Sequence, residues 1–557
     1  MTEANYKEVR LCYKNIVYQI KELIKMDNYY KIYVKFYKGS DFIMKFHRYT
    51  VLLIFSFFTA LTFSQNRLEV GYIYNESSNI DGYEKKISEY DLNNDGINEK
   101  VITFFKINGN KIDSYINIFI KENDSYRLGY QIFDSVLLNL SEMDKLNSKI
   151  SKIKDYYQKI SSGIQPNEIR YVNVYIDDNP EDLKMNLKYS KNSPKNLNNF
   201  IFIKSLSNLK SSPNDKADNL GVLKYTEKPE LIFDLISSVN GKEELWYYVK
   251  NNNKEVITEG FLVGNKGIKR GFYWNEISSR INMINSFIAE SNKNSKDLYV
   301  ILAYVPLSKN YFSPVDKFGN RSTQSIKAYT NKSLEGEYIN IPDQSLFRKL
   351  SETAEYIELE TPFYGGPYYI KNNSKVYKKV SLDDKINRYI AIDTNSQSEV
   401  AVERNIENNQ YEVIAYSFVT TGKDNGYSSY DTPHGVFMVA HTRTYMMFTR
   451  NLKSTENIKT IPKRLVAGQG QVIAGEAPYA IRFSGGAYLH GVPGPIGASS
   501  AAKWYTASKI GTYKESHKCV RHYDDQIKFL FEWLSVENYN KDDREIPLKE
   551  DAIVFVL

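Results

Sequence analysis

Residues 516–534 read SHKCVRHYDDQIKFLFEWL, and this stretch decides how the C-terminal part of the chain folds. Its second half predicts a helix, because apolar residues recur on one helical face: Ile527, Leu530, Phe531 and Leu534. An acidic pair at 524–525 suits the N-terminal end of that helix. Cys519 therefore lies in a loop just ahead of a helix, between His517 and Arg521. Cationic neighbours and a nearby helix N-terminus favour its thiolate.

A second stretch, AYLHGVPG at 487–494, places His490 at the end of an aromatic strand and beside a tight turn. Apart from His47, every His lies between 434 and 522, and so does the one Cys that follows residue 12. Side chains able to act as base or nucleophile near neutral pH are therefore concentrated in the last quarter of the chain. Cys519 is either a buried bystander or a nucleophile, and His490 and His517 are its candidate bases. The other ionisable side chains of this region are expected to be structural or solvated: His434, His441, His522, Lys423 and Arg443.

Four motifs between 388 and 557 occur in one order. They are RYIAIDTNSQSEVAVER (388–404), TTGKDNGYSSYDTPHGVFMV (420–439), Y-x-H-G at His490, and S-H-x-C-V-R from Ser516 to Arg521. Together they resemble the catalytic domain of the L,D-transpeptidases (YkuD-type), with its mixed β-sandwich or barrel-like fold. Two features depart from the family pattern. Lys518 stands where the family usually has Gly, and the insertion 495–515 is long.

The resemblance implies acyl transfer by Cys519, with His490 as the base and the Gly491 carbonyl as its orienting partner. His517 would support the nucleophile loop and Arg521 would brace that loop or the base. The remaining candidates are Ser516 and Lys518 for the loop and its oxyanion site, and Thr432, Gly435, Trp504 and Tyr505 for substrate contacts. The implied substrate is a peptidoglycan tetrapeptide stem, which would lose D-Ala and be joined to an amine of a second stem. No cofactor is implied for catalysis.

Two other functions remain open from the sequence. One is a Cys/His hydrolase, a carboxypeptidase or an amidase, that acts on wall peptides. The other is a non-catalytic surface protein that binds the cell wall.

The charge argues against a nucleic-acid partner. The formal net charge is +7, but residues 1–65 hold ten Lys and Arg against five Asp and Glu, so only +2 remains for the rest. Phosphate binding needs a concentrated basic face, which this distribution does not predict.

Residues 44–65 (MKFHRYTVLLIFSFFTALTFSQ) have the layout of a secretory signal, with an apolar run too short for a membrane span. Residues 1–43 are either a start assigned too early or a tail on an uncleaved signal anchor, which would be the sole membrane contact.

The sequence therefore predicts an exported protein of the bacterial periplasm or cell envelope, mainly β, with several domains. A β-rich domain is expected over 66–215, with strands such as 100–105 and 115–120 and a helix at 141–160. A linker is expected at 207–220. An SH3-like α+β region over 221–360 follows, with a hairpin at 244–264, a helix at 275–292 and a strand at 297–307. A connector (361–387) leads to the catalytic domain (388–557).

A calcium loop is a further candidate. The string DLNNDGINE (91–99) places oxygen-bearing side chains at alternate positions ahead of a Gly turn, which suits Ca²⁺. The candidate ligands are Asp91, Asn93, Asp95 and Glu99. The alternative is a polar turn that binds no metal.

Overall fold

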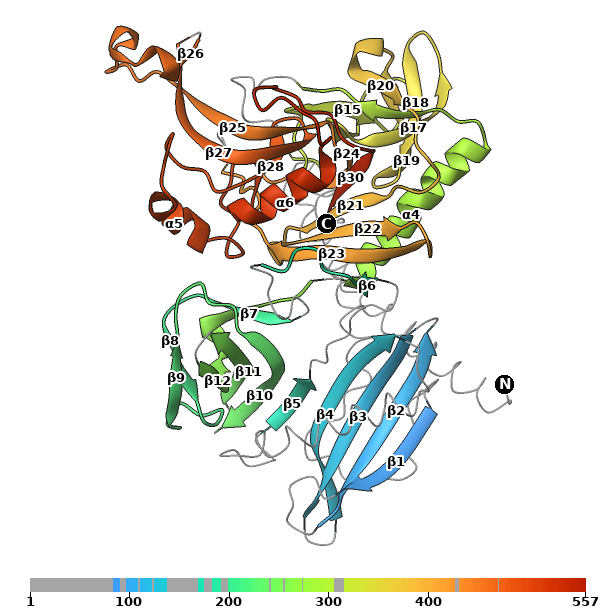
Figure 1. Ribbon diagram of the computed structural model, residues 1–557. Helices are drawn as coiled ribbons and strands as arrows, with labels where there is room; N and C mark the ends of the chain where they lie inside the picture. Colours follow the sequence, from blue (N-terminus) through green and yellow to red (C-terminus); the bar gives the residue numbers. More distant parts are fainter. Residues whose placement is uncertain are drawn as a thin grey trace, which may run out of the picture. The chain divides into compact units, whose positions relative to one another are not determined.

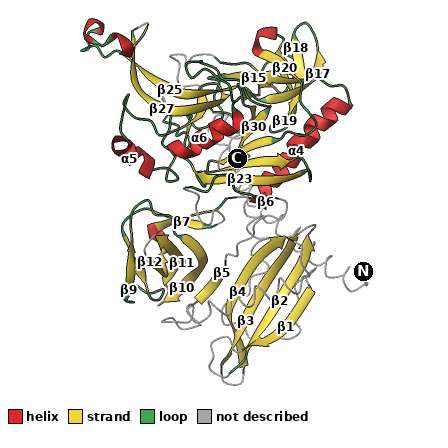
Figure 2. Ribbon diagram, viewed as in Figure 1, coloured by secondary structure: helices red, strands yellow, loops and turns green. Residues whose placement is uncertain are grey.

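The computed structural model describes residues 84–90, 97–108, 111–122, 125–137, 169–174, 183–191, 199–239, 242–253, 256–272, 274–304, 315–425, 430–468 and 470–557. These residues form five β-sheets and three α-helices, so the chain is mainly β as predicted (Figures 1 and 2). The candidate signal at 44–65, residues 1–43 and the predicted helix at 141–160 lie outside the described residues. Within the described ranges, no helix is long and apolar enough to cross a membrane.

The first sheet is a four-stranded antiparallel meander in the order β1-β2-β3-β4. Its strands are β1 (Glu84–Tyr90), β2 (Glu99–Asn108), β3 (Lys111–Glu122) and β4 (Ser125–Leu137). The strands predicted at 100–105 and 115–120 lie within β2 and β3. Glu99 opens β2 and is buried, whereas the other three candidate calcium ligands lie outside the described residues.

The second sheet has eight strands, in the order β13-β7-β10-β11-β12-β8-β9 with β5 on β10. Its strands are β5 (Ile169–Val174), β7 (Phe200–Ile203), β8 (Ser207–Lys210), β9 (Asn219–Leu223), β10 (Glu230–Val239), β11 (Lys242–Asn253), β12 (Val256–Val263) and β13 (Gly267–Arg270). The hairpin predicted at 244–264 is present as β11 and β12. The linker predicted at 207–220 is wrong. Its polar residues form the turn of the β8–β9 hairpin, and Leu209 is fully buried.

The third sheet has seven strands in the order β16-β15-β19-β18-β17-β14-β20. Its strands are β14 (Leu298–Ile301), β15 (Ser325–Tyr329), β16 (Tyr338–Pro342), β17 (Leu346–Glu352), β18 (Tyr356–Thr361), β19 (Gly365–Lys371) and β20 (Tyr377–Val380). The stretch 361–387 therefore carries strands of this sheet as well as connecting the chain. The predicted helix at 275–292 is present as α4 (Trp274–Lys293).

The last two sheets form the C-terminal part. The six-stranded sheet, in the order β24-β30-β21-β22-β23-β6, contains β6 (Lys184–Met185), β21 (Arg388–Asp393), β22 (Ser398–Asn405), β23 (Gln410–Phe418), β24 (Gly435–Met438) and β30 (Ala552–Val556). The five-stranded sheet, β25-β27-β28-β29 with β26 on β27, contains β25 (His441–Asn451), β26 (Val466–Gly468), β27 (Gln471–Ser484), β28 (Ala487–His490) and β29 (Val520–Arg521).

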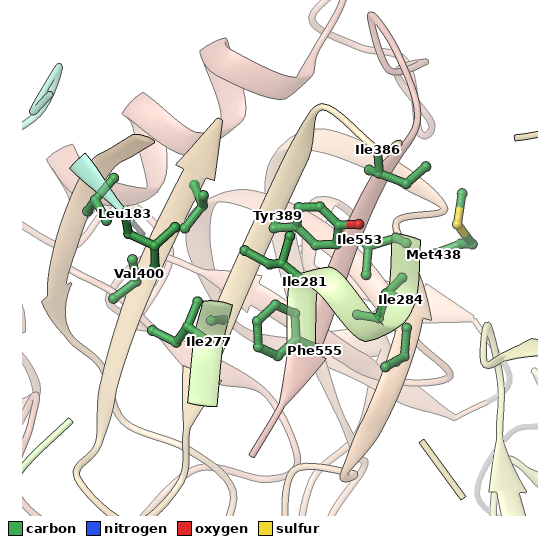
Figure 3. Close-up of a cluster of buried hydrophobic side chains, with 14 of the residues drawn as sticks. Leu183, Ile277, Ile281, Ile284, Ile386, Tyr389, Val400, Met438, Ile553 and Phe555 are labelled. Carbon is green, nitrogen blue, oxygen red and sulfur yellow. The ribbon is translucent and has the colours of Figure 1, made fainter. Parts of the chain in front are cut away.

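Three helices and two cores complete this region. Helix α4 places Ile277, Ile281 and Ile284 on one face, which packs on buried side chains of β21 and β30 (Figure 3). Helix α6 (Asp524–Leu534) buries the apolar face expected from the sequence in a second core, shared by the six- and five-stranded sheets. Helix α5 (Ser500–Ser508) lies in the insertion 495–515. The catalytic motifs therefore end on strands with a packed core behind them.

Candidate active site

The strands β28 and β29 bring His490 and Cys519 together. They pair in parallel, with Leu489 opposite Val520 and His490 opposite Arg521. The pairing continues beyond β29, where the His522 amide donates to the His490 carbonyl (2.9 Å). Cys519 immediately precedes β29 and therefore stands beside Tyr488, two residue pairs along from the pair that contains His490. Since side chains alternate along strands, Cys519 and His490 share one face of the sheet.

His490 is arranged as a neutral base. Its side chain is 2% exposed, and its Nδ1 lies 2.7 Å from the Gly491 carbonyl oxygen. A carbonyl can only accept, so Nδ1 carries the proton and Nε2 keeps a free lone pair. Burial lowers the pKa of His490 to about 3. The imidazole is therefore uncharged near pH 7.

Gly491 has no room for a side chain. A Cβ there would lie 2.6 Å from Asp524 Oδ1 and 2.6 Å from Pro478 Cγ. The Gly491 amide donates to the Pro478 carbonyl (2.9 Å), and the next amide, of Val492, donates to Asp524 Oδ1 (2.7 Å). These bonds fix the carbonyl that orients His490.

The Cys519 thiol is buried, with 6% of the residue exposed. It donates to the Gly486 carbonyl (3.4 Å) and packs with Ala480 and Tyr488. Burial raises its pKa, although the Tyr488 amide and the positive charges of Arg521 and Lys518 oppose the rise. Desolvation of the thiol therefore opposes the thiolate that the cationic neighbours are expected to favour.

Lys518 adopts the backbone conformation that the family's Gly would take. Its φ is +78°, in the left-handed region that non-Gly residues rarely occupy. The side chain is buried, and its Nζ donates to Gln324 Oε1 (3.0 Å). Burial lowers the pKa of Lys518 to about 8. The departure from the family motif thus leaves the loop geometry possible and adds a buried amine beside the nucleophile.

Two residues in turns of the seven-stranded sheet, Gln324 and Asp343, hold the chain on either side of Cys519, at 482–486 and at Lys518. Gln324 Oε1 accepts from the Gly486 amide (2.9 Å) as well as from Lys518. Asp343, fully buried, accepts from the Arg482 guanidinium (2.6 Å) and from the Gly485 amide (2.8 Å). Sequence reasoning missed Gln324 and Asp343, because no local pattern marks a contact made from another sheet.

Three motif residues brace the nucleophile loop from behind. Ser516 is buried and its hydroxyl donates to the Cys519 carbonyl. Thr432, predicted to contact substrate, is instead buried, and its Oγ1 donates to the Lys518 carbonyl (3.0 Å). Arg521 exchanges main-chain hydrogen bonds with Thr420 (2.8 and 3.0 Å), which fixes β29 on its free side.

Other predicted site residues lie away from the described contacts of Cys519. Gly435 is buried at the start of β24, where an added Cβ would lie 2.7 Å from Tyr364 Oη, so close packing accounts for it. His517 is exposed, and burial on one side lowers its pKa. Trp504 and Tyr505 lie on α5 and are 68% and 64% exposed. No group of three or more metal-binding side chains occurs within the described ranges.

His522 is not the solvated helix-start residue that the sequence suggests. It is fully buried, with Nε2 2.7 Å from Glu399 Oε2 and Nδ1 3.1 Å from the Val520 carbonyl. Glu399 is also buried and accepts from Gln526 Nε2 (3.1 Å). The strand alternation through 520–522 turns His522 inward, opposite to Arg521. His441 is buried as expected, and burial lowers its pKa to about 3.

Comparison with known families agrees with this geometry. Residues 387–544 match the family model YkuD, the L,D-transpeptidase catalytic domain. No curated protein gave a match to the chain. The C-terminal segment therefore matches an L,D-transpeptidase catalytic domain.

Proposed function

We propose that this protein is an exported cysteine L,D-transpeptidase that cross-links or remodels peptidoglycan. The observation that carries the proposal is the pairing of β28 with β29. It sets a neutral, oriented His490 beside the Cys519 loop, within the segment that matches the L,D-transpeptidase family. A nucleophile, its base and a third group that holds the base are the parts that acyl transfer requires.

In the first half-reaction, Cys519 Sγ attacks the carbonyl carbon of the bond that precedes the terminal D-Ala of a tetrapeptide stem. The thiol proton passes to His490 Nε2, and the carbonyl oxygen carries the negative charge of the tetrahedral intermediate. The C–N bond then breaks, and His490 returns the proton to the leaving amine of D-Ala. The product is a thioester on Cys519.

In the second half-reaction, the amine of another stem attacks the thioester carbonyl. His490 takes a proton from that amine and gives it back to the departing sulfur. The stems are then joined by an amide bond and the free thiol is restored. Burial of Cys519 and His490 supports transfer to an amine, because a site that excludes water disfavours hydrolysis of the thioester.

The test is incubation of the purified protein with disaccharide-tetrapeptides, followed by mass analysis of the products. We expect a cross-linked dimer and free D-Ala from the wild type, and neither from Cys519→Ala or His490→Gln. His434→Gln is the matched control, because that half-buried imidazole is not assigned a role. Release of D-Ala without dimer would identify a carboxypeptidase. No turnover by a folded wild type, or full activity of Cys519→Ala, would overturn the proposal.

A further inference from the structure

Arg443 of β25 lies near the site, and within the described residues no carboxylate pairs with it. Its guanidinium carbon lies 5.5 Å from the centre of the Tyr488 ring, and its Nε is buried without a hydrogen-bond partner. By contrast, Arg482 is paired with Asp343 (2.6 Å), and Arg450, further along β25, is paired with Glu456 (2.6 Å). A partly buried positive charge without a counter-ion is costly, so an anionic ligand would be stabilised here.

The strand registers place Arg443 on the face that carries the catalytic pair. Arg443 is opposite Ala480, Ala480 is opposite His490, and His490 is opposite Arg521. Residues directly opposite one another across strands share a face, and neighbouring strands lie about 4.8 Å apart. The backbone of Arg443 is thus two strand spacings, about 10 Å, from that of His490. The short side chain of Ala480 stands between them.

The charges around Arg443 do not neutralise it. Two ionisable residues lie close to it: Arg482 on the neighbouring strand β27, and His441, two residues earlier on β25. The first is a cation whose charge Asp343 already offsets. The pKa of the second is lowered to about 3, first by burial and then by both arginines, so this imidazole is uncharged near pH 7. The positive charge of Arg443 therefore remains available to a ligand.

We propose that Arg443 binds the carboxylate of the residue that leaves the donor stem, an inference that rests on the proposed function. The direction across the sheet supports this assignment. The acyl carbon is bonded at Cys519, beside β29, and the leaving amine receives its proton at His490 on β28. Beyond His490 in the same direction lies Arg443 on β25. The carboxylate of a terminal amino acid is one carbon from its amine, on the side away from the acyl group.

This assignment makes Arg443 a specificity-determining residue that selects stems ending in a free carboxylate. Arg521 lies on the opposite side of His490, on the side of the acyl group, and so cannot replace Arg443 in this contact. Lys would keep the charge of Arg443 but lose the two-pronged geometry with which a guanidinium holds a carboxylate.

The experiment compares two peptides, a tetrapeptide stem that ends in D-Ala and the same stem ending in D-Ala carboxamide. Their affinities are measured by calorimetry for Cys519→Ala, which cannot react, and for Cys519→Ala/Arg443→Gln. A hydrogen bond to a charged group contributes about 1.5–3 kcal/mol, which is roughly a 10–100-fold change in affinity. We expect Cys519→Ala to prefer the acid by that factor. Arg443→Gln should abolish the preference by weakening only the acid.

The matched control is Cys519→Ala/Arg450→Gln, which removes an arginine of the same strand and should keep the full preference. Equal binding of the two peptides by Cys519→Ala would overturn the inference, and so would an unchanged preference in the Arg443→Gln variant. If that variant does not fold, Cys519→Ala/Arg443→Lys is measured instead. We expect its preference for the acid over the carboxamide to be reduced severalfold, and an undiminished preference would overturn the inference. Turnover by the wild type is a separate readout. A binding preference without any turnover would contradict the proposed reaction and leave the carboxylate site standing.

Discussion

The Lys518 amine donates a hydrogen bond to Gln324 Oε1 over 3.0 Å, and both residues have left-handed backbones, with φ of +78° and +59°. Such conformations cost about 1–3 kcal/mol each for residues other than Gly and persist where the surrounding structure enforces them. Here the hydrogen bond joins two such residues, one beside β15 of the seven-stranded sheet and one beside β29 of the five-stranded sheet. The residue before the nucleophile is thus fixed through a hydrogen bond to a neutral amide.

Replacing Lys518 by Met should stabilise the protein at pH 7. The pKa of Lys518 is lowered from 10.5 in an exposed chain to about 8 in the fold, so between these values the unfolded chain binds more protons and stability rises with pH. Below pH 8 the whole cost is present, and a shift of this size corresponds to about 3 kcal/mol. Urea unfolding of both proteins from pH 7 to 10.5 should show the Lys518→Met gain shrink as the pH rises. A constant difference would contradict the prediction. The pKa of Lys228 is also lowered to about 8. Because Lys228 is present in both proteins, its contribution cancels in the difference between their unfolding free energies.

Alkylation of Cys519 should require alkaline pH. Burial raises the pKa of the thiol above its usual value, and only the thiolate reacts with iodoacetamide. We expect the rate of labelling, followed by mass analysis of the peptide that contains Cys519, to rise with a midpoint above pH 9. His490→Gln should leave the midpoint unchanged, because His490 is uncharged throughout this range. A midpoint below pH 7, lost in His490→Gln, would instead show a resting ion pair.

Removing Asp343 should uncouple the seven-stranded sheet from the catalytic segments. Asp343→Ala removes the carboxylate that pairs with Arg482 and the acceptor of the Ala303 and Gly485 amides, and loss of one partner of a buried pair costs about 3–5 kcal/mol. Thermal unfolding should show a clear decrease, and turnover at a temperature where the variant is folded should fall. Asp424→Ala is the matched control, because its pair with Arg321 is partly exposed and should contribute less than about 1 kcal/mol. Equal effects of the two substitutions would contradict the assigned role of Asp343.

The His522–Glu399 pair should behave as one unit. His522→Leu leaves a buried carboxylate with Gln526 alone and should destabilise the protein by about 3–5 kcal/mol, as should Glu399→Leu. The double variant replaces both polar groups with apolar ones and should lose much less than the sum of the two. Urea unfolding of the four proteins gives the coupling energy. Additive losses would show that the two side chains act independently.

The sequence was sufficient to predict which residues carry the chemistry of the site. It was not sufficient to predict the residues from other sheets that contact them. Motif order and residue type predicted that His490 and Cys519 meet, and periodicity predicted α4 and α6, because these features are local. Gln324 and Asp343 come from turns of a different sheet, and contacts over such separations leave no periodic trace. His522 was predictable in principle, since alternation through a short strand turns it inward. The charged flanks of the helix suggested solvent instead.

The parallel pairing of β21 with β30 also constrains the order in which the C-terminal region folds. Arg388 pairs with Ala552, so the first and last strands of the catalytic region are neighbours in the sheet, and β24 completes its edge through β30. Closing so long a loop is an entropic barrier that local contacts cannot bypass, and such topologies fold slowly. During synthesis, strands β21 to β29 emerge before their central partner exists. The six-stranded sheet is therefore completed only after the nucleophile and its base, which lie at the five-stranded sheet, have both been synthesised.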